Sequence, residues 1–259
     1  EWSLPIPMVA VEGVISKKGN VMLRASASRN HRAPSLNDLY FRPGGNPDLR
    51  SEQGWSYDAG ISSEVGRKDT YKLKMSVSWF ESWIDDWILW LPTPKGFFSP
   101  RNVKDVHAYG VELKADANVA LSEEWSIALN GSFSWTPSIN VGEKLSPADM
   151  SVGKQLPYVP EYSSSVTGRI GWKQWSFLYK WCYYSERYTM SSNDNTLSGK
   201  LPTYYINNIT LERLLTFSWA DLSIKASVNN LFDEEYVSVL SRPMPGINFE
   251  IFIGITPKW

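Results

Sequence analysis

The chain has 259 residues and a formal net charge of -1, so its charge does not favour nucleic acid as a partner. The single cysteine, Cys182, excludes an internal disulfide and a cysteine metal cluster, and the two histidines, His31 and His107, leave little for a zinc or haem site. No stretch approaches the ~18 apolar residues of a transmembrane helix. The 13 tryptophans suit a membrane interface better than a soluble core, because each buried indole N–H needs an acceptor.

Apolar and polar residues alternate along most of the chain, and helical spacing appears nowhere at comparable length. Such alternation places one face of a strand in an apolar environment and the other in a wet one. A clear example is Tyr71, Leu73, Met75, Val77 and Trp79, which alternate with Lys72, Lys74, Ser76 and Ser78. We predict about eleven strands, at residues 8–15, 21–28, 55–65, 70–79, 106–119, 125–135, 162–172, 175–184, 204–215, 222–230 and 248–256.

The predicted connections alternate strictly between short and long. The long ones span residues 29–54, 80–105, 136–161, 185–203 and 231–246. Outer-membrane β-barrels have tight periplasmic turns on one rim and long extracellular loops on the other. The strand that runs from Trp125 to Trp135 fits this class, because ten residues at ~3.3 Å each and a tilt of ~40° give a height of about 25 Å. The sequence therefore predicts an all-β, antiparallel transmembrane barrel in the bacterial outer membrane.

An odd number of strands raises a second expectation. Bacterial single-chain barrels have an even number of strands, and an open sheet in lipid leaves edge groups without hydrogen-bond partners. We therefore expect that residues 1–259 are the C-terminal half of a barrel and that further strands precede them. A soluble all-β protein is the alternative, and it has to account for five long loops at one end of the strands.

Four segments then resemble the motifs of one family, the TonB-dependent outer-membrane receptors. His31 to Tyr40 is similar to the family's "FRAP" box, with His31 in the usual Phe place, and Asn46 to Leu49 resembles its "NPxL" box. Asn230 to Tyr236 is similar to "NLFDxxY", and the segment from Pro245 to Trp259 resembles the closing strand with its terminal aromatic. The segments occur in the family's order along the whole chain.

The resemblance implies a barrel of about 22 strands, of which this chain supplies eleven, with the plug domain and the N-terminal strands absent from the sequence. It also implies active import of a scarce nutrient, namely an iron-siderophore, cobalamin or haem. The energy comes from TonB, through an N-terminal segment that the sequence lacks. Outer-membrane lipid is the surrounding partner, and neither an enzyme activity nor a bound cofactor is implied.

No catalytic or metal-binding constellation stands out, so aromatic loop residues are the candidate ligand-binding residues. These are Tyr40, Phe41, Trp87, Trp90, Phe97 and Phe98. Flat ligands such as siderophores, corrinoids and porphyrins bury their faces against such rings. The alternative is an aromatic girdle at the membrane interface, which we favour for Trp79 and Trp83.

Three further interpretations stay open from the sequence. Ser35 to Asp38 fits a capping box and predicts a short helical turn. Some haem receptors of the family use a histidine between the first two boxes; residues 35–45 contain none, although His31 is an alternative. In place of active import, the chain is compatible with a surface protein that binds carbohydrate through exposed aromatics, or with a passive porin.

Overall fold

The computed structural model describes residues 5–17, 19–67, 69–93, 95–102, 105–144 and 146–258. Its main feature is one antiparallel sheet in which eleven strands follow one another in chain order, with a short twelfth strand beside them. The eleven are β1 (Met8–Ser16), β2 (Val21–Arg32), β3 (Glu52–Arg67), β4 (Tyr71–Asp85), β7 (Val106–Ala120), β8 (Trp125–Trp135), β10 (Tyr162–Trp172), β11 (Trp175–Tyr184), β14 (Tyr204–Thr216), β15 (Ala220–Asn229) and β18 (Asn248–Pro257).

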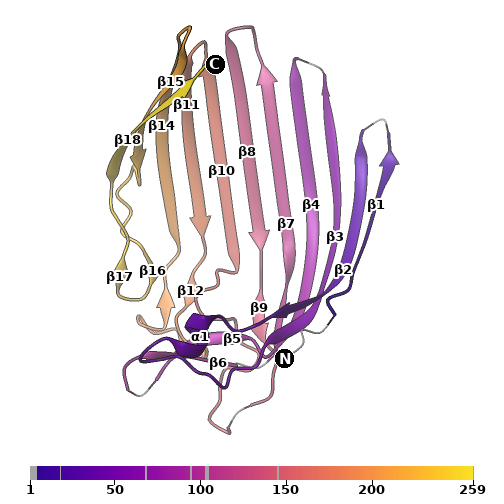
Figure 1. Cartoon of the computed structure of the whole chain (residues 1–259), viewed down its shortest axis with the longest axis vertical. Helices are drawn as coiled ribbons and strands as arrows, with labels where there is room; N and C mark the ends of the chain where they lie inside the picture. Colours follow the sequence, from indigo (N-terminus) through magenta and orange to yellow (C-terminus); the bar gives the residue numbers. More distant parts are fainter. Residues whose placement is uncertain are drawn as a thin grey trace.

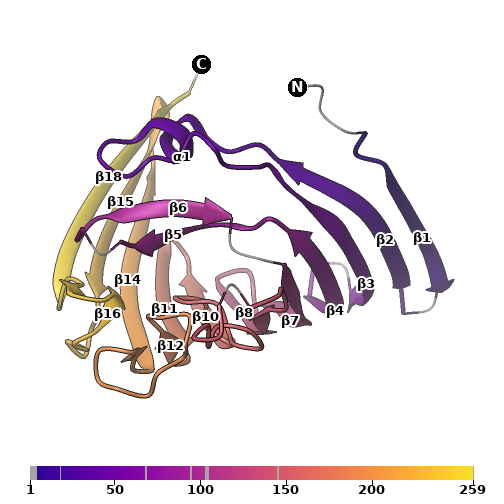
Figure 2. The ribbon, with the colours of Figure 1, turned by 90° about the horizontal axis from the view of Figure 1, so that it is seen from below.

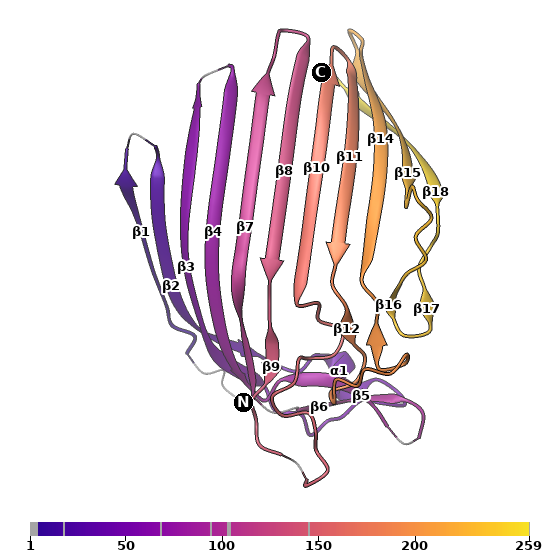
Figure 3. The same ribbon diagram turned by 180° about the vertical axis from the view of Figure 1, so that it is seen from behind.

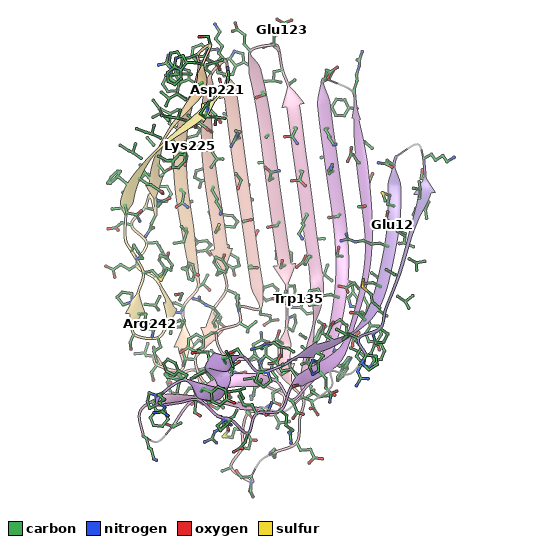
Figure 4. All side chains as sticks on the ribbon, viewed as in Figure 1. Glu12, Glu123, Trp135, Asp221, Lys225 and Arg242 are labelled. Carbon is green, nitrogen blue, oxygen red and sulfur yellow. The ribbon has the colours of Figure 1, made fainter. Side chains whose placement is uncertain are left out.

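The sheet curves into an open trough (Figures 1 and 2). All the short turns lie at one end of the strands and all the long loops at the other (Figures 1 and 3). Trp135 marks the loop end of β8, and Glu123 lies in the turn at its opposite end (Figure 4). Among the described strands, β1 and β18 each have a single neighbour within the sheet.

The register divides each strand into an apolar and a polar face. Trp79, Val77 and Met75 of β4 share one face with Val111, Leu113 and Ala115, their partners in β7. The other face carries polar pairs, and its serine hydroxyls meet across strands, as in Ser56–Ser82 at 2.7 Å and Ser132–Ser165 at 2.8 Å. Many large apolar side chains, such as Val77 at 44% exposure, are consequently left exposed rather than buried in a core.

The polar face is the concave one. The loop segments that lie across the inside of the trough in Figure 2 are held by Arg32 and Glu52, which are cross-strand partners on the polar face. The apolar face is therefore convex and points away from the trough, as the predicted barrel requires. Cys182 pairs with Ser165 and Ile206 on the concave face.

The eleven predicted strands are all present, and seven of them agree with the structure to within one residue at each end. The predicted ends at Ser28 and Trp79 were wrong, however, because β2 continues to Arg32 and β4 to Asp85. The predicted start of β3 at Trp55 was also late, since the strand begins at Glu52. The apolar alternation stops at the aromatic girdle, but the ladder of backbone hydrogen bonds continues beyond it.

The long loops contain small elements that the sequence analysis did not predict. They are β5 (Ile88–Pro92) paired with β6 (Phe98–Asn102), β9 (Ser138–Asn140) beside β7, β12 (Arg187–Tyr188) paired with β13 (Lys200–Leu201), and β16 (Val237–Val239) paired with β17 (Arg242–Pro243). The single helix of the described residues is α1 (Leu36–Tyr40), and no described helix is long and apolar enough to cross a membrane. Trp259, the predicted terminal aromatic, lies outside the described residues.

Candidate ligand-binding site at the loop end

The first long loop begins with helix α1, which the predicted capping box sets in place. The Ser35 hydroxyl accepts a hydrogen bond from the Asp38 backbone N–H at 3.1 Å, and the Asp38 carboxylate accepts one from the Ser35 N–H at 2.9 Å. The two reciprocal bonds satisfy groups that the first turn of a helix otherwise leaves unpaired. The prediction of a short helical turn is thus confirmed.

Asp38 also connects this helix to the second long loop. Its side chain is buried and accepts a hydrogen bond from the indole N–H of Trp90 in β5, at 2.9 Å. The guanidinium group of Arg32, at the end of β2, forms two ion pairs: its nitrogens lie 3.6 Å from a carboxylate oxygen of Asp38 and 2.8 Å from one of Glu52. Glu52, also buried, accepts a further bond from the backbone N–H of Ile88 at 2.8 Å. One arginine and two acids therefore fix the β5–β6 hairpin against α1.

Backbone contacts complete this attachment. The Asn46 side-chain amide donates to the Pro100 carbonyl at 3.2 Å, and the Asn102 side chain both accepts from and donates to the backbone of Arg50. Gly44 lies so close to the hairpin that a Cβ there would be 2.0 Å from the Phe98 carbonyl oxygen. Only glycine allows this approach. Residues 36–50 and the β5–β6 hairpin thus form one unit, which we call the loop 1–2 module.

The electrostatics of the module favour the ionised form of Asp38. Burial by itself raises the pKa of this carboxyl group, but the hydrogen bonds from Ser35 and Trp90 and the charge of Arg32 outweigh it. The pKa of Asp38 therefore lies below its usual value.

A pocket of about 320 Å³ separates the module from the third and fourth long loops. Trp90 and Phe98 supply rings from the hairpin, while Tyr158 and Met190 face them from the other two loops. The full lining is Leu89, Trp90, Leu91, Phe98, Pro157, Tyr158, Thr189, Met190 and Ser191. None of these side chains is charged, and two carry hydroxyl groups besides the phenol of Tyr158. The pocket suits a ligand with an apolar face and a periphery that forms hydrogen bonds.

Comparison with known families decides what kind of barrel this is. Residues 16–231 match the family model described as "TonB dependent receptor-like, beta-barrel". The chain belongs to the TonB-dependent receptor family. This is a family of outer-membrane β-barrel receptors and not of enzymes, so the convex apolar face of the receptor chain is its lipid-facing side and the concave face lines its lumen.

Individual relatives agree with this assignment. The chain is 27% identical over 222 residues to a vitamin B12 transporter, BtuB, of Photobacterium profundum, and 28% identical over 214 residues to BtuB of Vibrio vulnificus. These alignments cover 83% and 82% of the chain. The receptor chain spans about a third of the length of these relatives, 32% and 30% respectively.

Solved structures show the same fold. The copper transporter OprC superposes with a TM-score of 0.70 at 18% identity, over 97% of this chain and 39% of that one. A mutant ferric enterobactin receptor, PfeA, of Pseudomonas aeruginosa in complex with enterobactin superposes with a TM-score of 0.65 at 17% identity, over 98% of this chain and 40% of that one.

The structure places two of the six candidate ligand-binding residues in the pocket lining and the other four outside it. Trp90 and Phe98 line the pocket. Phe41 packs edge-on against Trp90 with ring centroids 5.7 Å apart, on the α1 side of the hairpin, and Tyr40 beside it is 65% exposed. Trp87 lies half-buried before β5, and Phe97 lies half-buried in the hairpin turn, where its carbonyl accepts a bond from the Thr93 N–H at 2.8 Å.

The two histidines do not reach the lumen. His31 pairs with Gln53, and His107 pairs with Trp83, all on the lipid-facing side of the sheet. Trp79 and Trp83 lie on the same side, as expected for a girdle. The placement of His31 therefore gives no support to its role as a haem ligand inside the barrel.

Sequence reasoning missed the polar residues that organise the loops. Arg187 is 4% exposed, donates to the carbonyls of Pro202 and Val237 at 3.3 Å each, and lies 4.7 Å from the Tyr204 ring. It thereby joins the fourth and fifth loops. Asn230, the first residue of the NLFDxxY segment, is buried and exchanges hydrogen bonds with the Glu234 backbone at 2.9 Å. The motif itself was the signal for Asn230, whereas nothing local marked Arg187.

Proposed function

We propose that the receptor to which this chain belongs imports a scarce nutrient across the outer membrane with energy supplied through TonB. The observation that carries the proposal is the uncharged aromatic pocket between the loop 1–2 module and the third and fourth loops, at the rim of a TonB-dependent receptor barrel. In this proposal the chain supplies wall and ligand-binding loops. Its strands β1 and β18 join the rest of the receptor in a barrel of about 22 strands around a plug.

We further propose that the ligand is an uncharged, flat-faced compound of the cobalamin type rather than a ferric siderophore or haem. The five long loops between the barrel strands, at residues 33–51, 86–105, 136–161, 185–203 and 230–247, together carry twelve Asp and Glu residues against ten Lys and Arg residues. Capture of a polyanionic ferric complex or of haem carboxylates calls for an excess of positive charge, which steers and pairs anions. The names of the curated relatives, which are vitamin B12 transporters, support the same choice.

The test uses the whole receptor, in cells for uptake and in detergent for binding. Cyanocobalamin, ferric enterobactin and haemin are the probes. We expect binding of cyanocobalamin alone and uptake that disappears in cells lacking TonB. Tighter binding of ferric enterobactin or haemin would refute the ligand assignment, and TonB-independent uptake would refute active transport.

Pocket variants connect binding to the site. Trp90→Ala and Phe98→Ala each remove a ring from the lining and should weaken cyanocobalamin binding by about tenfold to a hundredfold. Replacing residues 88–102 by a short Gly-Ser linker should impair uptake while the barrel still assembles. The matched control is Phe133→Ala, which removes an aromatic ring from the lipid-facing side of β8. Unchanged uptake of all three probes in the variant with the Gly-Ser linker would show that the hairpin is not part of the ligand-binding site.

A further inference from the structure

The lipid-facing side of the last six barrel strands carries one charged side chain, near the turn end. Trp175 of β11 has the parity opposite to that of Cys182, which lies on the concave face, so Trp175 and its partner in β14, Arg213, face outward. Among the described residues of β8, β10, β11, β14, β15 and β18, the register turns no other Asp, Glu, Lys or Arg outward. The charge of Arg213 is therefore isolated on this face.

The surroundings of Arg213 are apolar. Leu211 and Leu215 lie two residues away on the same face of β14, and Ile224 of β15 is its cross-strand partner. The Arg213 guanidinium lies over the Trp175 ring, 4.7 Å from the ring centroid. Among the described residues, none accepts a hydrogen bond from this guanidinium or forms an ion pair with it. A charge on the lipid-facing side of a barrel costs free energy, so the site favours a partner of opposite charge.

Other charges in the same strands and turns form pairs. Lys173, in the turn between β10 and β11, lies 3.1 Å from Glu124 in the neighbouring turn. Lys225 lies 3.2 Å from Glu212, and both face the lumen. Each pair brings together one positive and one negative charge. The outward positive charge of Arg213 consequently has no counter-charge from these residues.

Two apolar hollows lie on the lipid-facing side, in the two rows of side chains next to Arg213 toward the membrane centre. One, of about 290 Å³, lies between β8 and β11 and is lined on this side by Ile127, Leu129, Gly168, Ile170, Phe177 and Tyr179. The other, of about 330 Å³, lies between β11 and β18, and its lining includes Phe177, Leu211, Ala226 and Ile251. Phe177, two residues from Trp175, therefore separates the two hollows.

Small residues at Gly168 and Ala226 leave space in these two hollows. In the sheet, Gly168 pairs with Tyr179 and Ala226 pairs with Leu211, so each small residue lies beside a large outward side chain. Phe177 is 43% exposed between them. The result is two adjacent apolar depressions with one unpaired cation at their turn end, which we call the Arg213 site.

The Arg213 site matches the parts of one kind of molecule. A guanidinium binds phosphate oxygens through charge-assisted hydrogen bonds, and apolar hollows accept hydrocarbon chains. A zwitterionic headgroup also brings an ammonium group, for which the described residues of the six strands offer no outward carboxylate. A lipid with one chain fills only one hollow. A phospholipid with two chains and a net negative headgroup complements all three parts.

We propose that the Arg213 site binds an anionic diacyl phospholipid of the periplasmic leaflet. The lipid phosphate pairs with Arg213, and the two acyl chains lie on either side of Phe177. The short turns of such barrels are periplasmic, which places the headgroup at the periplasmic interface. The site is on the outside of the barrel, at the end opposite to the transport pocket, and does not depend on which ligand is transported.

The test is retention of added lipid by the delipidated whole receptor in detergent, measured by native mass spectrometry. The probes are phosphatidylglycerol, zwitterionic phosphatidylethanolamine, and lysophosphatidylglycerol, which has one acyl chain. We expect the parent to retain phosphatidylglycerol more strongly than either of the other lipids. Arg213→Gln should weaken the retention of phosphatidylglycerol by about tenfold, because it removes the charge that pairs with the phosphate. The charge control is Lys180→Gln, which removes a cation from the lumen side of β11 and should leave retention unchanged.

A second variant tests the hollows separately from the charge. Gly168→Leu fills the hollow between β8 and β11, and a Cβ at Gly168 has room, since the nearest atom is a Leu129 methyl carbon at 4.0 Å. It should weaken the retention of phosphatidylglycerol by about threefold to tenfold and leave that of lysophosphatidylglycerol unchanged. The matched control is Gly131→Leu, at a glycine of the same face that lines neither hollow.

The outcomes that contradict the proposal are distinct. Retention of phosphatidylglycerol by Arg213→Gln at the level of the parent, or equal retention of phosphatidylethanolamine and phosphatidylglycerol by the parent, would overturn the phosphate assignment. Unchanged retention of phosphatidylglycerol by Gly168→Leu would overturn the placement of the acyl chains. If Arg213→Gln does not assemble, Arg213→Lys gives the same test with a loss of about threefold, because an ammonium keeps the charge without the planar fork.

Discussion

Asp38 is the residue whose removal should most clearly separate loop stability from barrel stability. Its carboxylate accepts hydrogen bonds from the Ser35 N–H and the Trp90 indole N–H and lies 3.6 Å from Arg32. In Asp38→Ala, both donors lose their acceptor, while Arg32 keeps Glu52 as a partner. A hydrogen bond to a charged group contributes about 1.5–3 kcal/mol, and because Ser35 is exposed and Trp90 only half-buried, we expect the loop 1–2 module to lose about 2–5 kcal/mol of local stability for the two bonds together.

Amide hydrogen exchange of the whole receptor measures this loss directly. A loss of about 2–5 kcal/mol corresponds to exchange that is roughly 30-fold to several thousandfold faster. We expect the acceleration in residues 36–46 and in β5 and β6, where opening exposes the amides. Amides of β10 and β11 near the turn between Trp172 and Trp175, at the opposite end of the strands from the module, should exchange as in the parent.

Asp48→Ala is the control, because Asp48 lies exposed in the same loop. It should change exchange little. Asp38→Asn, which keeps one acceptor oxygen, should fall between parent and Asp38→Ala. Unchanged exchange of β5 and β6 in Asp38→Ala would refute the argument that the Asp38–Trp90 bond holds the hairpin in place.

Three further predictions concern the same loops. The folded-state pKa of Asp38 is depressed, so its contribution to stability is complete above the unfolded pKa and is lost as the pH falls through the folded-state pKa. Amide exchange of the loop 1–2 module should accelerate in that pH range, and Asp38→Asn should lose this pH dependence. Arg187→Ala should expose the fourth and fifth loops to limited proteolysis while the loop 1–2 module stays resistant, because Arg187 bonds to carbonyls of both loops; an unchanged cleavage pattern would contradict its bridging role. Gly44→Val should displace the hairpin and weaken cyanocobalamin binding, because the Cβ of the new side chain meets the Phe98 carbonyl oxygen. The control is Gly131→Val, which should bind cyanocobalamin like the parent, because no atom lies within 4 Å of a Cβ at that position.

The sequence alone determined the wall of the barrel. Period-2 alternation located all eleven strands, because a strand between lipid and water has to turn every second side chain to each medium. The strict alternation of short and long connections predicted that all the long loops lie at one end of the strands. The capping box at Ser35 and the NLFDxxY segment could also be identified from the sequence, because both depend on contacts within a few residues of the chain.

The arrangement of the loops was decided only by the tertiary structure. Nothing near Trp90 in the sequence shows that its indole N–H meets Asp38, which lies 52 positions earlier, or that Arg187 lies buried against carbonyls of two loops. The stacking of Trp83 on His107 likewise became visible only when the register showed that β4 continues beyond its predicted end at Trp79 and pairs with the start of β7. These contacts join segments that are distant along the chain, and local patterns of polarity carry no information about which distant segments meet.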